Sequence, residues 1–236
     1  MDRSTVTEDG QSIPMLDAWR AVPRPLSRGE RIVDLWVNGL AIVAGFVGVI
    51  VLMAVAIPQG SPRLTVSLLV YSFGLLAMVI CSAVYNGRSA SPRKDLLRRL
   101  DHAAIFMMIA GTYTPFLAVK MDGGWGRWLL LYVWAVAGLG VALKLIWVKR
   151  FERLSVMLYL FLGWTILVAI EPLAASASLP AIVLLAAGGI LYSVGVLFHL
   201  WERLAYQQPI WHGFVMAGAA CHYAAVLDVA LPGTFT

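Results

Sequence analysis

Long apolar runs recur along this chain, separated by short polar loops. Each run has about twenty residues, the length that a helix needs to cross ~30 Å of hydrocarbon. We therefore predict an all-α fold, a bundle of seven transmembrane helices. The predicted spans are Leu35–Pro58, Leu64–Tyr85, His102–Val119, Trp128–Val148, Leu154–Ile170, Leu179–Leu200 and Ile210–Leu231.

Composition supports a membrane location. Of the 236 residues, 60% are hydrophobic and 13% are charged, far from the usual balance of a soluble domain. A soluble chain of this length would not have enough polar surface to cover so much apolar side chain. The cysteines, Cys81 and Cys221, both fall inside predicted spans, so we expect no disulfide framework.

The first thirty or so residues differ from the rest of the chain. They mix charged residues with three prolines, so we predict that residues 1–33 form a cytoplasmic tail and an interfacial segment. Residues 34–236 form one transmembrane domain, because the loops are too short for a soluble appendage. The first apolar run begins too late and is too long for a signal peptide.

Basic residues set the expected direction of the bundle. Of the 18 lysines and arginines, all except Arg63, Lys120 and Arg127 fall on the same side of the seven predicted spans. The positive-inside rule then places the N-terminus in the cytoplasm and the C-terminus outside. This topology accounts for the net charge of +5, and no basic stripe with interleaved aromatic residues indicates nucleic-acid binding.

Polar residues gather at the cytoplasmic level of three predicted spans. Ser82 and Asn86 lie one turn apart at the end of the second span, Asp101 precedes the third, and Gln208 and His212 lie on one face at the start of the seventh. Polar groups at membrane depth normally face the bundle interior, because lipid cannot satisfy them. The sequence therefore predicts a polar pocket open to the cytoplasm.

The chain also resembles a known family over most of its length, from about residue 28 to 228. The segment "LLRRLDHAAIFMMIAGTYTPF" looks like the third-span signature of the hemolysin III family, which is related to the progestin and adipoQ receptors. Further matches are "RGERIVDLWVNGLA", "SAVY", "VWAVAGLGVALKL", "YLFLGW", "AAGGILYSVGVLF" and "IWHGFVMAGAACHYAAV". Their order and spacing agree with the family, and the compact form of the resemblance implies a bacterial inner-membrane protein.

The resemblance implies a zinc ion near the cytoplasmic face. In relatives three histidines hold it, one at the end of the second span and two at the start of the seventh. An aspartate opening the third span holds a water, and a serine lies close by. A zinc with three protein ligands keeps a fourth position for water, which it activates for attack on an amide or ester.

Residue by residue, this chain keeps part of that pattern. Ser82, Asp101 and His212 match, whereas Asn86 and Gln208 stand where two zinc histidines are expected. Asn38 likewise replaces the histidine of a first-span "THG". An amide oxygen is a weak zinc ligand compared with imidazole, so the replacements argue against the metal chemistry of the family.

Each of these residues also has a structural interpretation. Asn86 before Gly87 is typical of a left-handed helix end, and Asp101 would complement a helix dipole. The Ser82 hydroxyl would bond the carbonyl one turn back. Gln208 precedes a proline and would cap the last helix, while His212 would bond a neighbouring helix.

Three functions remain open from the sequence. We favour a member of the family that has lost its zinc site and binds a membrane lipid, or a protein partner that the sequence does not identify, without turnover. The second is a zinc-dependent hydrolase of a lipid amide or ester, in which His212 ligates the metal, Asp101 positions the metal-bound water and Ser82 steadies the transition state. The third, a cytolytic pore, follows from the family's name alone.

Overall fold

Seven helices of the computed structural model are long and apolar enough to cross a membrane. The structure describes residues 26–88, 93–121, 123–147 and 152–231, and within them it is 91% helical and has no strand. The predicted all-α, seven-transmembrane fold is thereby confirmed. The α-helices are α1 (Arg28–Ala56), α2 (Pro62–Gly87), α3 (Lys94–Pro115), α4 (Gly124–Trp147), α5 (Glu152–Trp164), α6 (Ile170–Ser176), α7 (Leu179–Leu200) and α8 (Gln207–Ala230).

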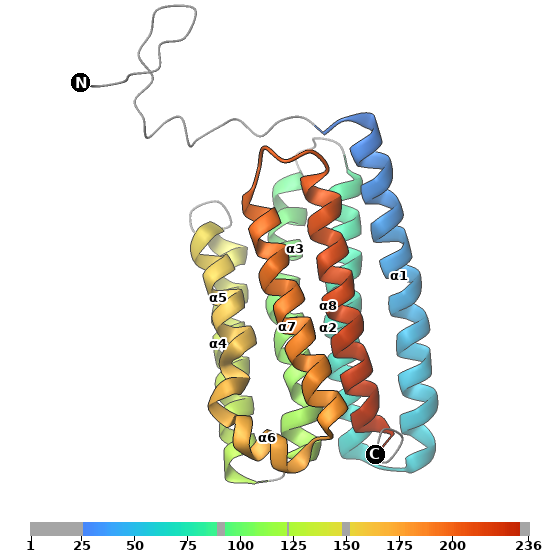
Figure 1. The fold of residues 1–236 in the computed structure, drawn as a ribbon, viewed down its shortest axis with the longest axis vertical. Coiled ribbons are helices and arrows are strands. Elements are labelled where there is room, and N and C mark those ends of the chain that lie inside the picture. Colours follow the sequence, from blue (N-terminus) through green and yellow to red (C-terminus); the bar gives the residue numbers. More distant parts are fainter. Residues whose placement is uncertain (1–25, 89–92, 122, 148–151, 232–236) are drawn as a thin grey trace, which may run out of the picture.

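The helices form a closed bundle (Figure 1). Each of α1 to α4 packs against the next helix, α5 packs against α4 and α7, and α8 packs against α7 and α1. α3 also contacts α8. Helices from the two ends of the chain therefore lie together, so residues of α1, α2, α3 and α8 are able to share one site.

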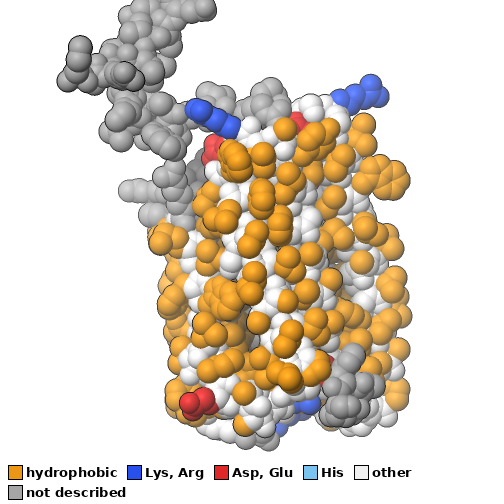
Figure 2. Space-filling model, viewed as in Figure 1, with side chains coloured by type: hydrophobic (Ala, Val, Ile, Leu, Met, Phe, Trp, Pro, Cys, Tyr) orange, Lys and Arg blue, Asp and Glu red, His pale blue; other side chains and the backbone are white. Residues whose placement is uncertain are grey.

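The flank of the bundle is apolar. Figure 2 shows hydrophobic side chains over the lateral surface, with charged side chains near its two ends. Large apolar side chains are exposed on several helices, among them Trp36, Ile50, Leu139, Met157 and Leu197. Such a surface suits hydrocarbon rather than water, so the chain is a multi-pass membrane protein.

α1 begins with a capping box. The Ser27 hydroxyl accepts a hydrogen bond from the Glu30 backbone N–H (3.2 Å), and the Glu30 carboxylate accepts one from the Ser27 backbone N–H (2.7 Å). These bonds satisfy donors that the first turn of a helix leaves open. The helix therefore extends into the segment predicted to be interfacial, while residues 1–25 of the predicted tail lie outside the described residues.

The fifth span is broken, although the sequence predicts one continuous run. α5 ends at Trp164, a 3-10 segment covers Thr165–Ala169, and α6 follows. Pro172 removes an N–H from this stretch. The Tyr113 hydroxyl of α3 reaches the break, where it accepts a hydrogen bond from the Ile166 N–H (2.8 Å) and lies within donating distance of the Leu162 carbonyl (2.9 Å). The break thus has its backbone groups satisfied from a neighbouring helix.

α2 and α3 approach each other closely. A Cβ added to Gly74 would lie 2.8 Å from the Met107 carbonyl oxygen, and one added to Gly111 would lie 3.2 Å from the Val70 carbonyl oxygen. Small residues allow such contact between membrane helices. The contact holds the end of α2 that carries Ser82 beside the beginning of α3, where Asp101 lies.

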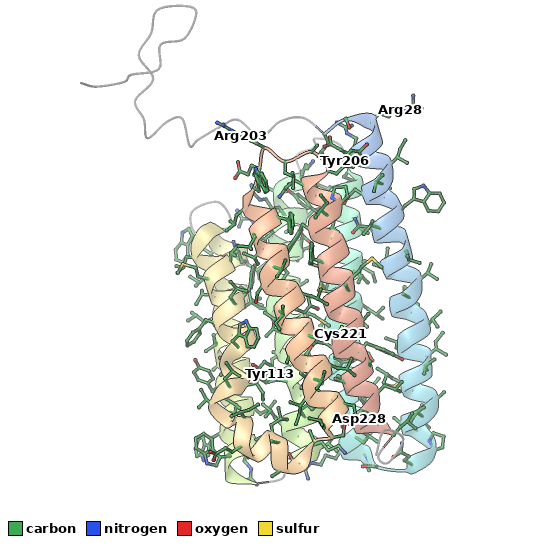
Figure 3. All side chains as sticks on the ribbon, in the orientation of Figure 1. Arg28, Tyr113, Arg203, Tyr206, Cys221 and Asp228 are labelled. Atoms are coloured by element: carbon green, nitrogen blue, oxygen red, sulfur yellow. The ribbon has the colours of Figure 1, made fainter. Side chains whose placement is uncertain are left out.

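Arg28, Arg203 and Tyr206 lie at one end of the bundle and Asp228 at the other (Figure 3). With seven spans, α1 begins and α8 ends on opposite sides of the membrane. The cytoplasmic location of the end that carries Arg28 and Arg203 stays a prediction from the positive-inside rule.

Candidate functional site

The site begins with a polar stripe on α1. Glu30, Asp34 and Asn38 are spaced four residues apart, so they lie on one face of the helix. All three are buried, with 1%, 3% and 6% of their surface exposed. The stripe therefore faces the bundle, although the surrounding positions of α1 are largely exposed and apolar.

Glu30 fixes the start of α8. Its Oε1 accepts a hydrogen bond from the Tyr206 backbone N–H (2.7 Å), and Tyr206 has a left-handed backbone with φ of 57°. A bulky residue in that conformation needs support from its surroundings. Glu30 supplies part of that support, and α8 then begins at Gln207 with its first turn directed at α2.

His212 lies at the centre of the cluster. Its Nδ1 lies 2.6 Å from Asp34 Oδ1, and its side chain is 13% exposed while that of Asp34 is 5% exposed. An ionised carboxylate is an acceptor only, so Nδ1 carries the proton in this contact. The Asn38 amide nitrogen lies 3.3 Å from Nδ1 and donates to the Asp34 main-chain oxygen (2.9 Å). The Nε2 atom is thereby left free to accept.

The Nε2 side of His212 faces α2. Ser82 Oγ lies 3.5 Å from Nε2 and Asn86 Nδ2 lies 3.4 Å from it. Asn86 Nδ2 also donates to Ser82 Oγ (3.2 Å), and the Asn86 side-chain oxygen accepts from Gln208 Nε2. Three helices thus contribute to one hydrogen-bonded cluster, formed by Asp34, Asn38, Ser82, Asn86, Gln208 and His212, which we call the amide–histidine cluster.

A cavity of about 560 Å³ opens from this cluster. Asn38, Ser82, Asp101 and His212 line it at the cluster. From there it extends along α1 as far as Val51, about 20 Å at 1.5 Å per residue. Its remaining lining is mainly apolar side chains of α1, α2 and α8. The result is a long apolar cavity with polar groups at one end.

The cavity opens on the flank of the bundle. Val47 and Val51 of α1 line it, yet they are 55% and 39% exposed. Side chains that line a cavity and remain this exposed mark an opening, here on the surface that faces lipid. The cavity is therefore open toward the lipid-facing flank.

The structure brings together Ser82, Asn86, Gln208 and His212 by hydrogen bonds, and Asp101 lines the same cavity. Within the described part of the chain, Asp101 forms no hydrogen bond to the others. It lies in the second turn of α3, which begins at Lys94, so it does not cap that helix as one interpretation held.

Two further structural interpretations do not match the geometry. α2 ends at Gly87 with an extended C-cap at Arg88, so Asn86 and Gly87 do not form a left-handed helix end. Gln208 is inside α8, because its N-cap is Tyr206. The side chains of both amides instead face the cluster.

Sequence reasoning missed Asp34 altogether and treated Asn38 only as a replaced histidine. The signal was the spacing of Glu30, Asp34 and Asn38, every fourth residue at the start of an apolar helix. A polar stripe with helical period on a membrane helix faces the interior. Reading that stripe would have added α1 to the predicted site.

The residues present do not fit the zinc that the family resemblance implies. A catalytic zinc takes three protein ligands, and His212 is the only imidazole in the cluster. Asn86 and Gln208 bond each other through their amides. Among the residues that the structure describes, no group of three or more His, Cys, Asp or Glu side chains is placed to hold a metal ion.

Comparisons with known proteins agree with the resemblance. Residues 29–223 match the family model described as Haemolysin-III related. The chain is 37% identical over 198 residues to the Hemolysin-3 homolog of Bacillus subtilis (strain 168), covering 84% of this chain and 93% of the relative. It is 36% identical over 203 residues to Hemolysin-3 of Bacillus cereus, covering 86% and 93%.

A more distant similarity reaches animal proteins. The chain is 27% identical over 165 residues to the human monocyte to macrophage differentiation factor, covering 66% of this chain and 67% of the relative. No solved structure matches the chain significantly.

Proposed function

Because the chain belongs to the hemolysin III family of membrane proteins, we propose that it binds a single-chain lipid in the cavity between α1, α2 and α8. The acyl chain occupies the apolar length of the cavity, and the polar head lies against the amide–histidine cluster. The protein acts in the inner membrane of a bacterium, with the cluster at the cytoplasmic level. Binding there needs no zinc.

One observation carries this proposal: a long apolar cavity ends at a group of polar side chains. The volume of about 560 Å³ falls within the range of about 300–1,000 Å³ typical of small-molecule sites. A single-chain lipid has the same distribution of polarity, with a polar head group at one end and a long apolar chain at the other. Asn38, Ser82 and His212 offer both donors and acceptors for a carbonyl or hydroxyl of the head group.

The shape of the cavity favours a lipid over a protein partner. Its walls come from within the bundle, and its opening is on the lipid-facing flank at Val47 and Val51. A protein segment entering from the bilayer would need its backbone hydrogen bonds satisfied inside the cavity. An acyl chain has no such requirement.

Lipid binding is tested with the purified chain in detergent, incubated with a lysophospholipid whose single chain is joined by a non-hydrolysable ether and examined by native mass spectrometry. The wild type should retain about one lipid per chain. Ala41→Phe places a ring in the cavity and should reduce the bound fraction at least tenfold, because a phenyl group fills space that the chain needs.

Leu40→Phe is the matched control, since the neighbouring Leu40 is 61% exposed on the outer face of α1. It should bind lipid like the wild type. Equal loss in the two variants, or no stoichiometric binding by the wild type, contradicts the proposal.

The cytolytic hypothesis is supported only by the names of the Bacillus relatives. Planar-bilayer recordings test it directly. We expect no current from the purified chain, since the cavity opens on the lipid-facing flank and its polar end is occupied by the hydrogen-bonded cluster.

A further inference from the structure

Resting on the proposed lipid binding, we propose that Ser82, His212 and Asp34 form a metal-free nucleophilic triad. In this arrangement Ser82 attacks the carboxylic ester of a single-chain lipid held in the cavity. This proposal replaces the favoured interpretation of the sequence, a lipid-binding site without turnover, by a site that also hydrolyses the lipid. The hydrolytic route differs from that of a zinc enzyme, because the nucleophile is a side chain of the protein.

The contacts follow the order of a serine, a base and an orienting carboxylate. Asp34 Oδ1 lies 2.6 Å from His212 Nδ1. On the other edge of the ring, His212 Nε2 lies 3.5 Å from Ser82 Oγ. The three residues come from α1, α8 and α2, so the arrangement is produced by the fold and not by a local sequence motif.

Asp34 fixes the tautomer that this chemistry needs. With the Nδ1 proton held by the carboxylate, Nε2 presents a lone pair to the serine hydroxyl. The separation of 3.5 Å is long for a working contact. Catalytic hydrogen bonds are often long without substrate and shorten when it binds.

Ser82, which is half-buried, differs from the buried hydroxyl groups that bond backbone carbonyls. Ser67, Thr112 and Thr114 each donate to a backbone carbonyl of their own helix. In the described ranges, Ser82 is the only serine or threonine whose hydroxyl lies within hydrogen-bond distance of a histidine ring. It also lines the cavity, so a carbonyl at the polar end of a bound lipid reaches it.

Asn86 lies beside the reacting atoms. Its Nδ2 is 3.2 Å from Ser82 Oγ and 3.4 Å from His212 Nε2, while its oxygen is occupied by Gln208 Nε2. An amide donor held in this place stabilises the negative charge that develops during attack on a carbonyl. Asn86 and Gln208, which replace two zinc histidines of the family, therefore have separate roles in this proposal: Asn86 donates to the developing charge, and Gln208 holds the Asn86 amide in place.

The reaction balances with water as the only co-reactant. Ser82 Oγ bonds to the ester carbonyl carbon while its proton passes to His212 Nε2, and the carbonyl electron pair moves to oxygen. Collapse of the adduct breaks the bond to the alcohol, which leaves with the proton from Nε2. Water then adds to the acyl-serine and gives its proton to Nε2. The second collapse releases the fatty acid and returns that proton to Ser82.

Asp101 lines the cavity at the same level from α3. Its carboxylate is an acceptor for the water that completes the second half of the reaction. Asp34 is a positioning residue, since it acts through the imidazole of His212.

The test uses a long-chain alkyl fluorophosphonate, which forms a covalent adduct with activated serines. The purified wild type should be labelled once per chain, with the adduct located on Ser82 by peptide mass spectrometry. Ser82→Ala should abolish labelling. Ser72→Ala, which removes another buried hydroxyl of α2, should leave labelling unchanged.

Turnover is followed with a lysophospholipid whose single fatty acyl chain is joined by a carboxylic ester, in the presence of a zinc chelator. Hydrolysis should persist with the chelator and disappear in Ser82→Ala. Asp34→Asn should lower kcat by about 10⁴-fold with KM nearly unchanged, as loss of the orienting carboxylate does in serine proteases. Asp34→Glu should recover part of that loss. A purely structural role for Asp34 predicts no such separation of kcat from KM.

Lipid binding is measured on the same samples, so the two proposals fail separately. Binding of a non-hydrolysable ether lysolipid without labelling or hydrolysis overturns the triad and leaves the proposed function in place. Loss of hydrolysis on chelation also overturns it, as does a label on another residue. Absence of both binding and labelling in the folded wild type removes the two proposals together. Because the ether lysolipid should block labelling of the wild type, the test does not depend on folding of the Ser82 variant.

Discussion

Two substitutions should convert the amide–histidine cluster into a zinc site. Asn86→His together with Gln208→His places three imidazoles around one point, with His212 as the third. In a tetrahedral site with Zn–N distances of about 2.0–2.1 Å, two ligand nitrogens lie about 3.4 Å apart. Asn86 Nδ2 and His212 Nε2 are already separated by 3.4 Å, and Gln208 and His212 share a face of α8.

The existing contact with Asp34 favours the same outcome. A zinc-bound histidine usually donates its other ring N–H to a carboxylate, and Asp34 already lies 2.6 Å from His212 Nδ1. At free zinc one hundred times the dissociation constant, binding stabilises a protein by about 2.7 kcal/mol. For a chain of this size that corresponds to a rise in melting temperature of about 5–11 °C.

Zinc content by elemental analysis and thermal melting in detergent check this prediction. The double variant should carry about one zinc per chain and melt higher with zinc than with a chelator. Asn86→His with Gln207→His is the matched control, because the neighbouring Gln207 bonds the His199 carbonyl outside the cluster. A folded Asn86→His/Gln208→His chain that takes up no more zinc than this control would refute the alignment of these positions with the family's ligands.

Two stability predictions concern the elements that position the site. Glu30→Gln should lower the melting temperature and weaken lipid binding, because it weakens the hydrogen bond that the Glu30 carboxylate accepts from the Tyr206 N–H (2.7 Å). Such charge-assisted bonds are worth about 1.5–3 kcal/mol. An unchanged melting curve would contradict a role for Glu30 in fixing the start of α8. Tyr113→Phe should cost about 1–3 kcal/mol, because it leaves the half-buried Ile166 N–H without an acceptor in a membrane span. Thermal melting beside the control Tyr132→Phe, which changes a tyrosine that is 41% exposed, separates this effect from general loss of a hydroxyl.

The sequence predicts the spans well because hydrocarbon imposes a minimum length on each apolar run. Ser82 and Asn86, like Gln208 and His212, are paired by helical spacing alone. Asp34 was harder to foresee, because only the closed bundle brings α1 beside α8. The break after Trp164 escaped prediction for a related reason, since a tyrosine from α3 satisfies its backbone groups.

At the site, the expected positions of Asp101 and Asn86 within their helices were wrong because hydropathy does not report the contacts made in the folded bundle. Asp101 was expected at the mouth of a helix, yet polar residues from Lys94 onward extend α3 beyond the apolar span. Hydropathy marks where a helix meets hydrocarbon and not where its hydrogen bonds begin. The left-handed end expected at Asn86 fails because its side chain bonds Ser82 and Gln208 from a helical backbone.

Lipid binding in the cavity is tested most simply by a crystal structure with an ether lysolipid whose alkyl chain carries bromine at its terminal carbon. We expect an anomalous bromine peak inside the cavity beside α1 and α8, with the lipid head against His212 and Ser82. A bromine peak on the outer flank of the bundle, or an empty cavity in crystals grown with excess lipid, would show that the cavity between α1, α2 and α8 is not the lipid site.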